Sequence, residues 1–184
     1  MGIFDFLKKK NAQAWYNKGV TLIELGRYEY AIQAYDKAIE HDPKYAVAWN
    51  NKGYALGVLG RYEYAIQAYD KAIELDPKHA QVWNNKGYVL GNLGRYEEAL
   101  QAYDKAIELD PKYATAWHSK GYALGNLGRY EEALQAYDKV IELDPMNAQA
   151  WHNKGIALYS LGRYDEARVC FDKEKNKKPN DSVF

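Results

Sequence analysis

The chain has 184 residues, with 25 basic and 25 acidic side chains and a formal net charge of zero. This balance argues against a nucleic-acid binder that relies on neutralising phosphates, and no apolar run approaches the roughly 18 residues of a membrane-spanning helix. Cys170 is the single cysteine, which excludes an intrachain disulfide and predicts a small buried thiol, because alanine occupies its equivalent position in the other repeats described below.

The chain begins with a short apolar and basic segment, residues 1–11, in which Phe4, Phe6 and Leu7 precede three lysines. The apolar stretch is too short for the core of a signal peptide, and its charges follow rather than precede it. We therefore expect a cytoplasmic protein. The favoured interpretation is that these apolar residues cover the exposed side of the first helix. The alternative is a contact with another chain or with a membrane surface.

From residue 12 onward the sequence repeats with a period of 34 residues. Each copy carries a tryptophan, a Leu-Gly-Arg-Tyr run, an alanine, an aromatic residue four positions later and a closing proline. The tryptophans are Trp15, Trp49, Trp83, Trp117 and Trp151. A fixed period indicates one supersecondary unit copied in tandem. The expected repeats are 12–45, 46–79, 80–113, 114–147 and 148–181, followed by a tail at 182–184.

Each repeat is predicted to form two helices, which in the second repeat span roughly 46–59 and 62–75. Around the first helix, Gly53 and Leu56 lie on the same side as Trp49, so glycine allows close approach by the second helix. Gly60 ends the first helix. In the second helix, apolar residues recur at i, i+3, i+4 and i+7, which is an amphipathic face. Pro77 ends that helix.

This framework resembles the tetratricopeptide repeat, and the resemblance covers all five copies. It implies an all-α fold, a right-handed superhelical α-solenoid of five antiparallel helix pairs. One departure is systematic, because lysine stands three residues after each tryptophan where the family pattern has leucine. We expect the aliphatic part of each lysine to lie along the packed surface. The lysines are Lys18, Lys52, Lys86, Lys120 and Lys154.

The second helix of the last repeat departs from the pattern of the others. Arg168 replaces Ile or Leu, Glu174 and Lys175 replace an apolar pair, and two lysines follow at 177 and 178. We interpret this as a polar cap, which the last repeat of an array needs for solubility.

The side of each first helix that points away from tryptophan is free for binding, and the resemblance implies that it lines the concave groove of the solenoid. The residues there carry almost no formal charge and are rich in tyrosine, asparagine, glutamine and histidine. Asparagine can both donate to and accept from a peptide backbone, and tyrosine offers rigid contact area. The candidate ligand-groove residues are Asn50, Asn51, Tyr54, Asn84, Asn85, Tyr88, His118, Tyr122 and His152.

No catalytic constellation, nucleotide-binding loop or metal motif is present in the sequence. His118 and His152 occupy equivalent positions in adjacent repeats, but no Cys, Asp or Glu shares that part of the groove, whereas metal sites need three or four ligands. We therefore expect neither an enzyme nor a metal or other cofactor.

The sequence favours a non-catalytic scaffold that binds an extended peptide or a partner helix in its groove, with no nucleic acid as partner. The alternative is a self-assembling structural module, because near-identical repeats can stack between chains as they do within one. A homodimer through the apolar N-terminal segment is compatible with either reading.

Overall fold

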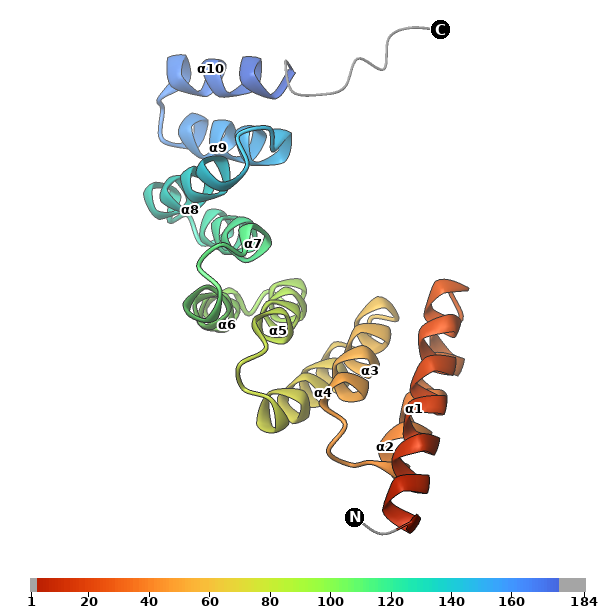
Figure 1. The fold of residues 1–184 in the computed structure, drawn as a ribbon. Helices are drawn as coiled ribbons and strands as arrows, with labels where there is room; N and C mark the ends of the chain where they lie inside the picture. The colour runs from red at the N-terminus through yellow and green to blue at the C-terminus, as the bar shows by residue number, and fades with distance from the viewer. Residues whose placement is uncertain (1–2, 176–184) are drawn as a thin grey trace, which may run out of the picture. The chain divides into compact units, whose positions relative to one another are not determined.

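The computed structural model describes residues 3–175, with side chains from residue 7 onward, and within that range it contains ten α-helices and no β-strand. The chain divides into two compact units, Met1–Gly94 and Arg95–Phe184, each described here by itself (Figure 1). The all-α class expected from the sequence is confirmed.

In both units each helix packs against its neighbours along the chain. In the first unit α1 packs on α2, α2 on α3, α3 on α4 and α4 on α5. The second unit repeats this order from α6 to α10. The first unit contains α1 (Ile3–Glu24), α2 (Tyr28–His41), α3 (Ala46–Val58), α4 (Tyr62–Leu75) and α5 (Ala80–Asn92). The second contains α6 (Tyr96–Leu109), α7 (Ala114–Asn126), α8 (Tyr130–Leu143), α9 (Ala148–Ser160) and α10 (Tyr164–Lys175).

The turn inside each repeat is set by its glycine. In the second repeat α3 ends at Val58, and Gly60 has a φ of +72°, a left-handed conformation that favours glycine. The chain reversal is closed by the Arg61 N–H, which donates to the Leu56 carbonyl at 2.9 Å. This is the pattern of a helix that ends in a left-handed residue. It explains why Leu-Gly-Arg recurs as a block.

The turn between repeats links the recurring proline to the recurring tryptophan. The Trp83 indole N–H donates to the Pro77 carbonyl at 3.0 Å, and the Asp76 carboxylate accepts from the Lys78 N–H at 3.3 Å. The tryptophan of one repeat therefore fixes the turn that follows the second helix of the preceding repeat. The same indole bond is made by Trp49, Trp117 and Trp151.

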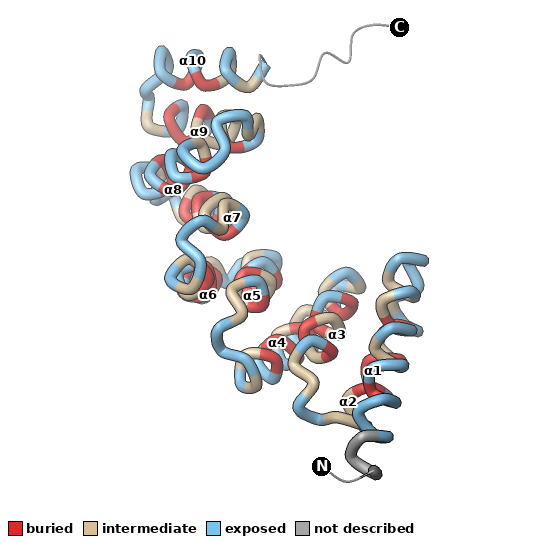
Figure 2. Tube along the Cα trace, viewed as in Figure 1, coloured by how far each residue is buried: buried red, intermediate tan, exposed pale blue. Residues whose placement is uncertain are grey.

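The core of a repeat forms where the tyrosine of its second helix meets the glycine of its first. Tyr69 is 2% exposed, and a Cβ added at Gly53 would lie 2.8 Å from its ring. No side chain fits there, which confirms the close approach expected at Gly53. Buried residues thus gather on the facing sides of the helices (Figure 2). Cys170, 4% exposed, is the buried thiol that the sequence predicted, and burial raises its pKa.

The systematic lysines lie along the packed surface, as expected. Lys52 sits over the Trp49 ring, 5.3 Å from its centroid, and its ammonium lies 2.6 Å from the Asp36 carboxylate of the preceding second helix. The side chain of Lys52 is 22% exposed. The same arrangement links Lys86 to Asp70, Lys120 to Asp104 and Lys154 to Asp138.

The two ends of the chain differ from the expectations in detail. Helix α1 begins at Ile3, so most of the segment 1–11 continues into the first helix; Leu7 is 47% exposed, and the side chains of Phe4 and Phe6 lie outside the described residues. At the other end Arg168 is exposed, but the Glu174 side chain is only 15% exposed because it bonds His152. Lysines 177 and 178 lie outside the described range.

Candidate protein-interaction surface

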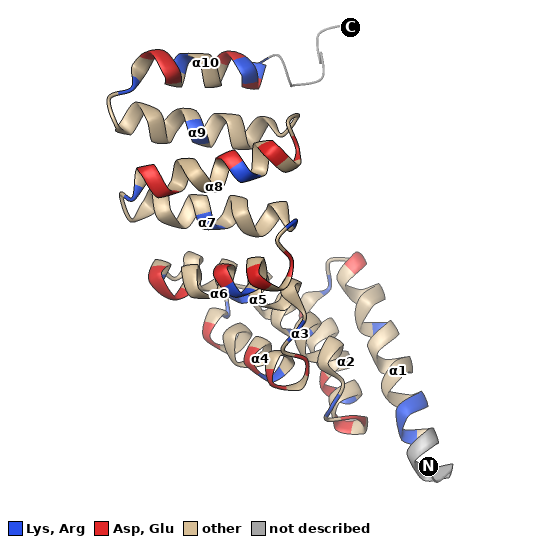
Figure 3. Cartoon of the chain, turned by 60° about the vertical axis from the view of Figure 1, so that its left-hand side comes forward, with Lys and Arg blue, Asp and Glu red and all other residues tan. Residues whose placement is uncertain are grey.

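The candidate residues lie on the first helices of repeats two to five: α3 and α5 in the first unit, α7 and α9 in the second. We call the surface of these helices that points away from tryptophan the first-helix face, and treat it separately in each unit. Each of these helices carries one formal charge, its lysine. Because that lysine is paired with the preceding second helix, the first-helix face is close to neutral. In Figure 3 the segments coloured for acidic residues lie on helices such as α8 and α10, whereas α7 and α9 show little charge.

The first-helix face presents large aromatic side chains to solvent. Tyr54 is 46% exposed, Tyr88 is 62% exposed and Tyr122 is 58% exposed. They occupy the same position in three successive repeats, and in the second unit Ile156 continues the series at 47%. Within each unit, two such exposed large side chains with an apolar body on successive first helices are typical of a surface that binds another molecule.

The asparagines of the first unit behave differently from the tyrosines. Asn50 and Asn84 are buried, at 7% and 6% exposure. The Asn85 amide donates to Asn50 Oδ1 at 3.3 Å, and the Asn50 amide donates to Asn51 Oδ1 at 3.1 Å. Asn51 in turn donates to the Tyr16 hydroxyl at 3.2 Å. The sequence predicted that these asparagines would offer hydrogen bonds to a ligand; in the structure Asn50, Asn51 and Asn85 form a ladder that joins adjacent repeats. Asn84 is also buried, but its Oδ1 has no hydrogen-bond partner within the described residues.

In the second unit histidine takes the place of asparagine in the ladder. The Asn153 amide Nδ2 lies 3.0 Å from His118 Nε2, and His152 Nδ1 lies 2.8 Å from Glu174. Because the amide nitrogen donates, His118 Nε2 accepts and the ring is neutral. Burial lowers the pKa of His118 below its ordinary value of 6.5, which agrees with a neutral ring.

The neutral His118 predicts a pH-dependent stability. Because the pKa of His118 is lower in the folded state than in the unfolded state, the unfolded protein binds a proton more readily. The contribution of neutral His118 to the free energy of unfolding is therefore complete above its unfolded pKa, near 6.5, and is lost as the pH falls below that value. Asparagine stands at the equivalent position of the second and third repeats, as Asn50 and Asn84. The variant His118→Asn should therefore lose the acid sensitivity that the protonation of His118 causes. Urea titrations of both proteins between pH 5 and 8 measure the difference. Parallel pH profiles would contradict the assignment.

A cavity opens on the first-helix face of the second unit. Its volume is about 240 Å³, and Tyr122 and Gly125 of α7 face Asn153 and Ile156 of α9 across it. A Cβ at Gly125 would meet no atom within 4 Å, so this glycine leaves space rather than closing a contact. At Gly57 of the first unit, in contrast, a Cβ would lie 3.4 Å from Val89. The two glycines thus serve different purposes.

The described residues contain no group of three or more His, Cys, Asp or Glu side chains placed to hold a metal ion. Within the same range no helix is both long and apolar enough to cross a membrane.

The first-helix face belongs to the first helix of each repeated helix pair. Comparison with known proteins identifies the family of this repeat. A family model described as "Tetratricopeptide repeat" matches residues 12–45, 46–79 and 80–113, which is more than half of the chain. The chain belongs to the tetratricopeptide repeat family. Further models of tetratricopeptide repeats match residues 102–135, 126–162 and 148–181.

Solved structures of other tetratricopeptide repeat proteins have the same fold. A crystal structure of MamA is 28% identical, with a TM-score of 0.82, and the match covers 87% of this chain and 94% of that one. YrrB, described as "a TPR protein with an unusual peptide-binding site", is 27% identical, with a TM-score of 0.78 over 98% of this chain and 94% of that one. MamA 41-end from Desulfovibrio magneticus RS-1, at 23% identity and a TM-score of 0.87, covers 94% of this chain and 98% of that one and supports the fold alone. The comparison with curated proteins gave no match.

Proposed function

We propose that this protein is a non-catalytic interaction scaffold that holds an extended peptide or a partner helix on its first-helix face. The observation that carries the proposal is that tyrosine is exposed at the same position of three repeats, as Tyr54 and Tyr88 in the first unit and as Tyr122 in the second, each on a helix face with little formal charge. YrrB, which shares the fold, is described as having a peptide-binding site. Tyrosine provides rigid area and a hydroxyl at small entropic cost, which suits recognition of a polypeptide.

The proposal divides the candidate residues into two groups. The exposed tyrosines supply contact area, and the cavity beside Tyr122 receives an apolar side chain of the ligand. Asn50 and His118 act beneath them by fixing the spacing between first helices, and Asn84 is buried beneath the surface as well. Asn51, Asn85 and His152, which are half-buried, stand at the margin where a ligand backbone can still reach them.

Two exposed tyrosines on first helices and two on second helices give a matched test. Tyr88→Ala with Tyr122→Ala should abolish capture of the ligand from a cell extract, because hot-spot aromatics each contribute about 2 kcal/mol or more. The control is Tyr64→Ala with Tyr164→Ala, which removes two equally exposed tyrosines, at 64% and 61%, from the second helices α4 and α10. Affinity capture read by mass spectrometry, with circular dichroism to confirm folding, compares the variants with the wild type.

A partner retained by the wild type and the control, but lost by the first variant, supports the first-helix face as the binding surface. Equal loss in both variants, or in neither, contradicts it. Light scattering over a concentration series tests the alternative, a self-assembling structural module that forms dimers or head-to-tail oligomers. A monomer at every concentration would remove that alternative.

A further inference from the structure

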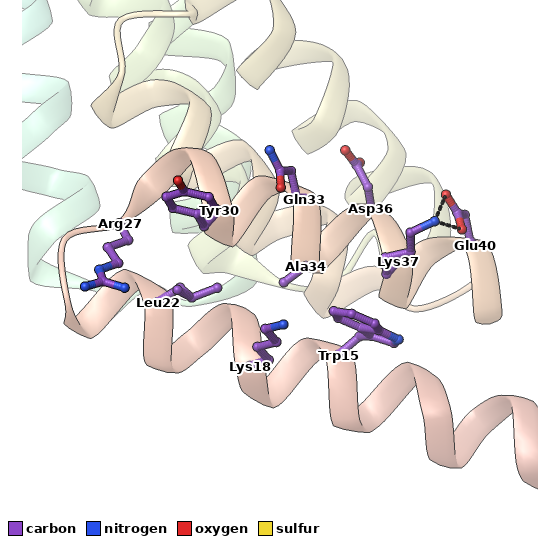
Figure 4. Close-up of a pocket in the computed structure, with 10 residues that line it drawn as sticks. All are labelled: Trp15, Lys18, Leu22, Arg27, Tyr30, Gln33, Ala34, Asp36, Lys37 and Glu40. Carbon is purple, nitrogen blue, oxygen red and sulfur yellow. Dashed lines mark hydrogen bonds and ion pairs between the residues drawn. The ribbon is translucent and has the colours of Figure 1, made fainter.

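The outer side of the first repeat carries a second open surface, between α1 and α2. A cavity of about 860 Å³ lies there, lined by Trp15, Lys18 and Leu22 of α1 and by Arg27 and Tyr30 at the start of α2. Figure 4 shows these side chains along the two helices. The cavity is distinct from the first-helix face because it contains tryptophan, which points the other way around α1.

The equivalent cavity of the second repeat has an additional wall, and that wall is a helix. Helix α2 contributes Ile32 and Asp36 to it. Ile32 packs against the core around Leu56, and Asp36 holds Lys52 at 2.6 Å. One turn before Ile32 on α2, the Glu29 carboxylate accepts from the Arg61 guanidinium at 2.8 Å.

The three α2 residues that form this wall follow a simple spacing. Glu29, Ile32 and Asp36 stand at i, i+3 and i+7, which places them on one face of a helix. They present an acid, an aliphatic side chain and a second acid to Arg61, Leu56 and Lys52 in that order. The first internal junction thus defines which helix fits this surface.

In the first repeat the receiving side of this junction is present, and no helix of the described residues packs on it. Leu22, Lys18 and Arg27 are the counterparts of Leu56, Lys52 and Arg61. Lys18 lies over the Trp15 ring, 4.7 Å from its centroid, but within residues 7–175 it has no acidic partner. Arg27 also has none in that range, because Tyr30 stands where Arg95, Arg129 and Arg163 have a glutamate three residues later.

We propose that this surface docks an amphipathic helix of a partner protein that presents an acid, an aliphatic residue and an acid at i, i+3 and i+7. Lys18 and Arg27, which have no acidic partner within residues 7–175, flank Leu22 and complement that pattern, as Lys52 and Arg61 flank Leu56 at the internal junction. The corresponding face of α10 carries Asp165, Arg168 and Asp172. A second copy of the chain would therefore bring an arginine to the apolar floor between two cations, which disfavours it as the occupant.

A peptide with the sequence of residues 28–41 is the probe, because it contains Glu29, Ile32 and Asp36 in their native spacing. A covalent bridge on the opposite face holds it helical, since an isolated helix of this length is marginal in water. Fluorescence anisotropy of the labelled peptide should show saturable binding to the wild type. Lys18→Glu should raise Kd about tenfold, since an attraction becomes a repulsion. A peptide carrying Asp36→Lys should recover most of the loss with that variant.

Two controls make the result specific. Lys37→Glu changes the charge equally within the same cavity, but Lys37 already pairs with Glu40, so Kd should change less than twofold. The Tyr88→Ala, Tyr122→Ala variant should bind the peptide as tightly as the wild type, so failure here is distinguishable from failure of the first-helix face. Absence of saturable binding, or equal loss with Lys18→Glu and Lys37→Glu, would overturn the proposal. A dimer that Lys18→Glu dissociates would also overturn it, by making a second copy the occupant.

Discussion

Replacing Gly121 with alanine is expected to destabilise the second unit by about 1–2 kcal/mol, whereas the same replacement at Gly125 is expected to stabilise it by about 0.5–1 kcal/mol. Both residues lie on α7, one turn apart. A Cβ at Gly121 would lie 2.7 Å from the Tyr137 ring, which is 3% exposed, so the ring would have to shift. At Gly125 nothing lies within 4 Å, so only the gain in helix propensity remains.

Urea titration followed by circular dichroism measures both changes under one set of conditions. The pair controls for helix propensity, because each variant makes the same exchange in the same helix. Equal effects of either sign would contradict the packing argument. Gly125→Ala also narrows the cavity of the first-helix face, so we expect this more stable variant to bind the ligand more weakly, a common conflict between stability and function.

The second large effect is expected at Asn50, where alanine should cost about 1–3 kcal/mol of stability. Asn50 is 7% exposed, accepts from Asn85 and donates to Asn51. Its removal leaves the Asn85 amide N–H and the Asn51 Oδ1 without these partners at half-buried positions between two helices. If Asn50 contacted only a ligand, its replacement would leave the stability of the free protein unchanged. The stability measurement therefore separates a structural role of Asn50 from a binding role.

The chain itself provides the control for Asn50. His118 occupies the equivalent position and accepts from Asn153 through Nε2. Asn50→His should therefore retain most of the stability near pH 7.5 and acquire the acid sensitivity predicted for His118. Urea midpoints at pH 7.5 and pH 5.5, for the wild type, Asn50→Ala and Asn50→His, give all three comparisons. An alanine variant as stable as the wild type would show that the ladder contributes nothing to stability.

Local features of the repeat could be predicted from the sequence because they depend on residues close together in the chain. The span expected for the first helix of the second repeat, 46–59, compares with Ala46–Val58, and that of its second helix agrees at both ends. Gly60 at the turn and Gly53 in the packed stripe were also predictable. A left-handed turn, and a missing side chain on the tryptophan side, both follow from helical geometry within one repeat.

The candidate surface could be predicted only in part. Helical periodicity gives the angle of a residue around its own axis, so Tyr54, Tyr88 and Tyr122 could be assigned to one side of their helices. It does not give the depth of that residue once a second helix has packed beside it. The neighbouring helix covers Asn50 and leaves Tyr54 exposed, four residues away.

The family, the helix pairs and the nearly neutral, tyrosine-rich character of one side of the first helices could all be inferred from the 34-residue period and from helical geometry. The tertiary structure decided which polar groups meet across repeats: Asn85 with Asn50, His152 with Glu174, and Lys52 with Asp36. It also decided that Lys18 and Arg27 of the first repeat have no such partner within the described residues. The physical reason is that these contacts depend on the distance and register between helix axes, which packing sets and a one-dimensional period does not contain.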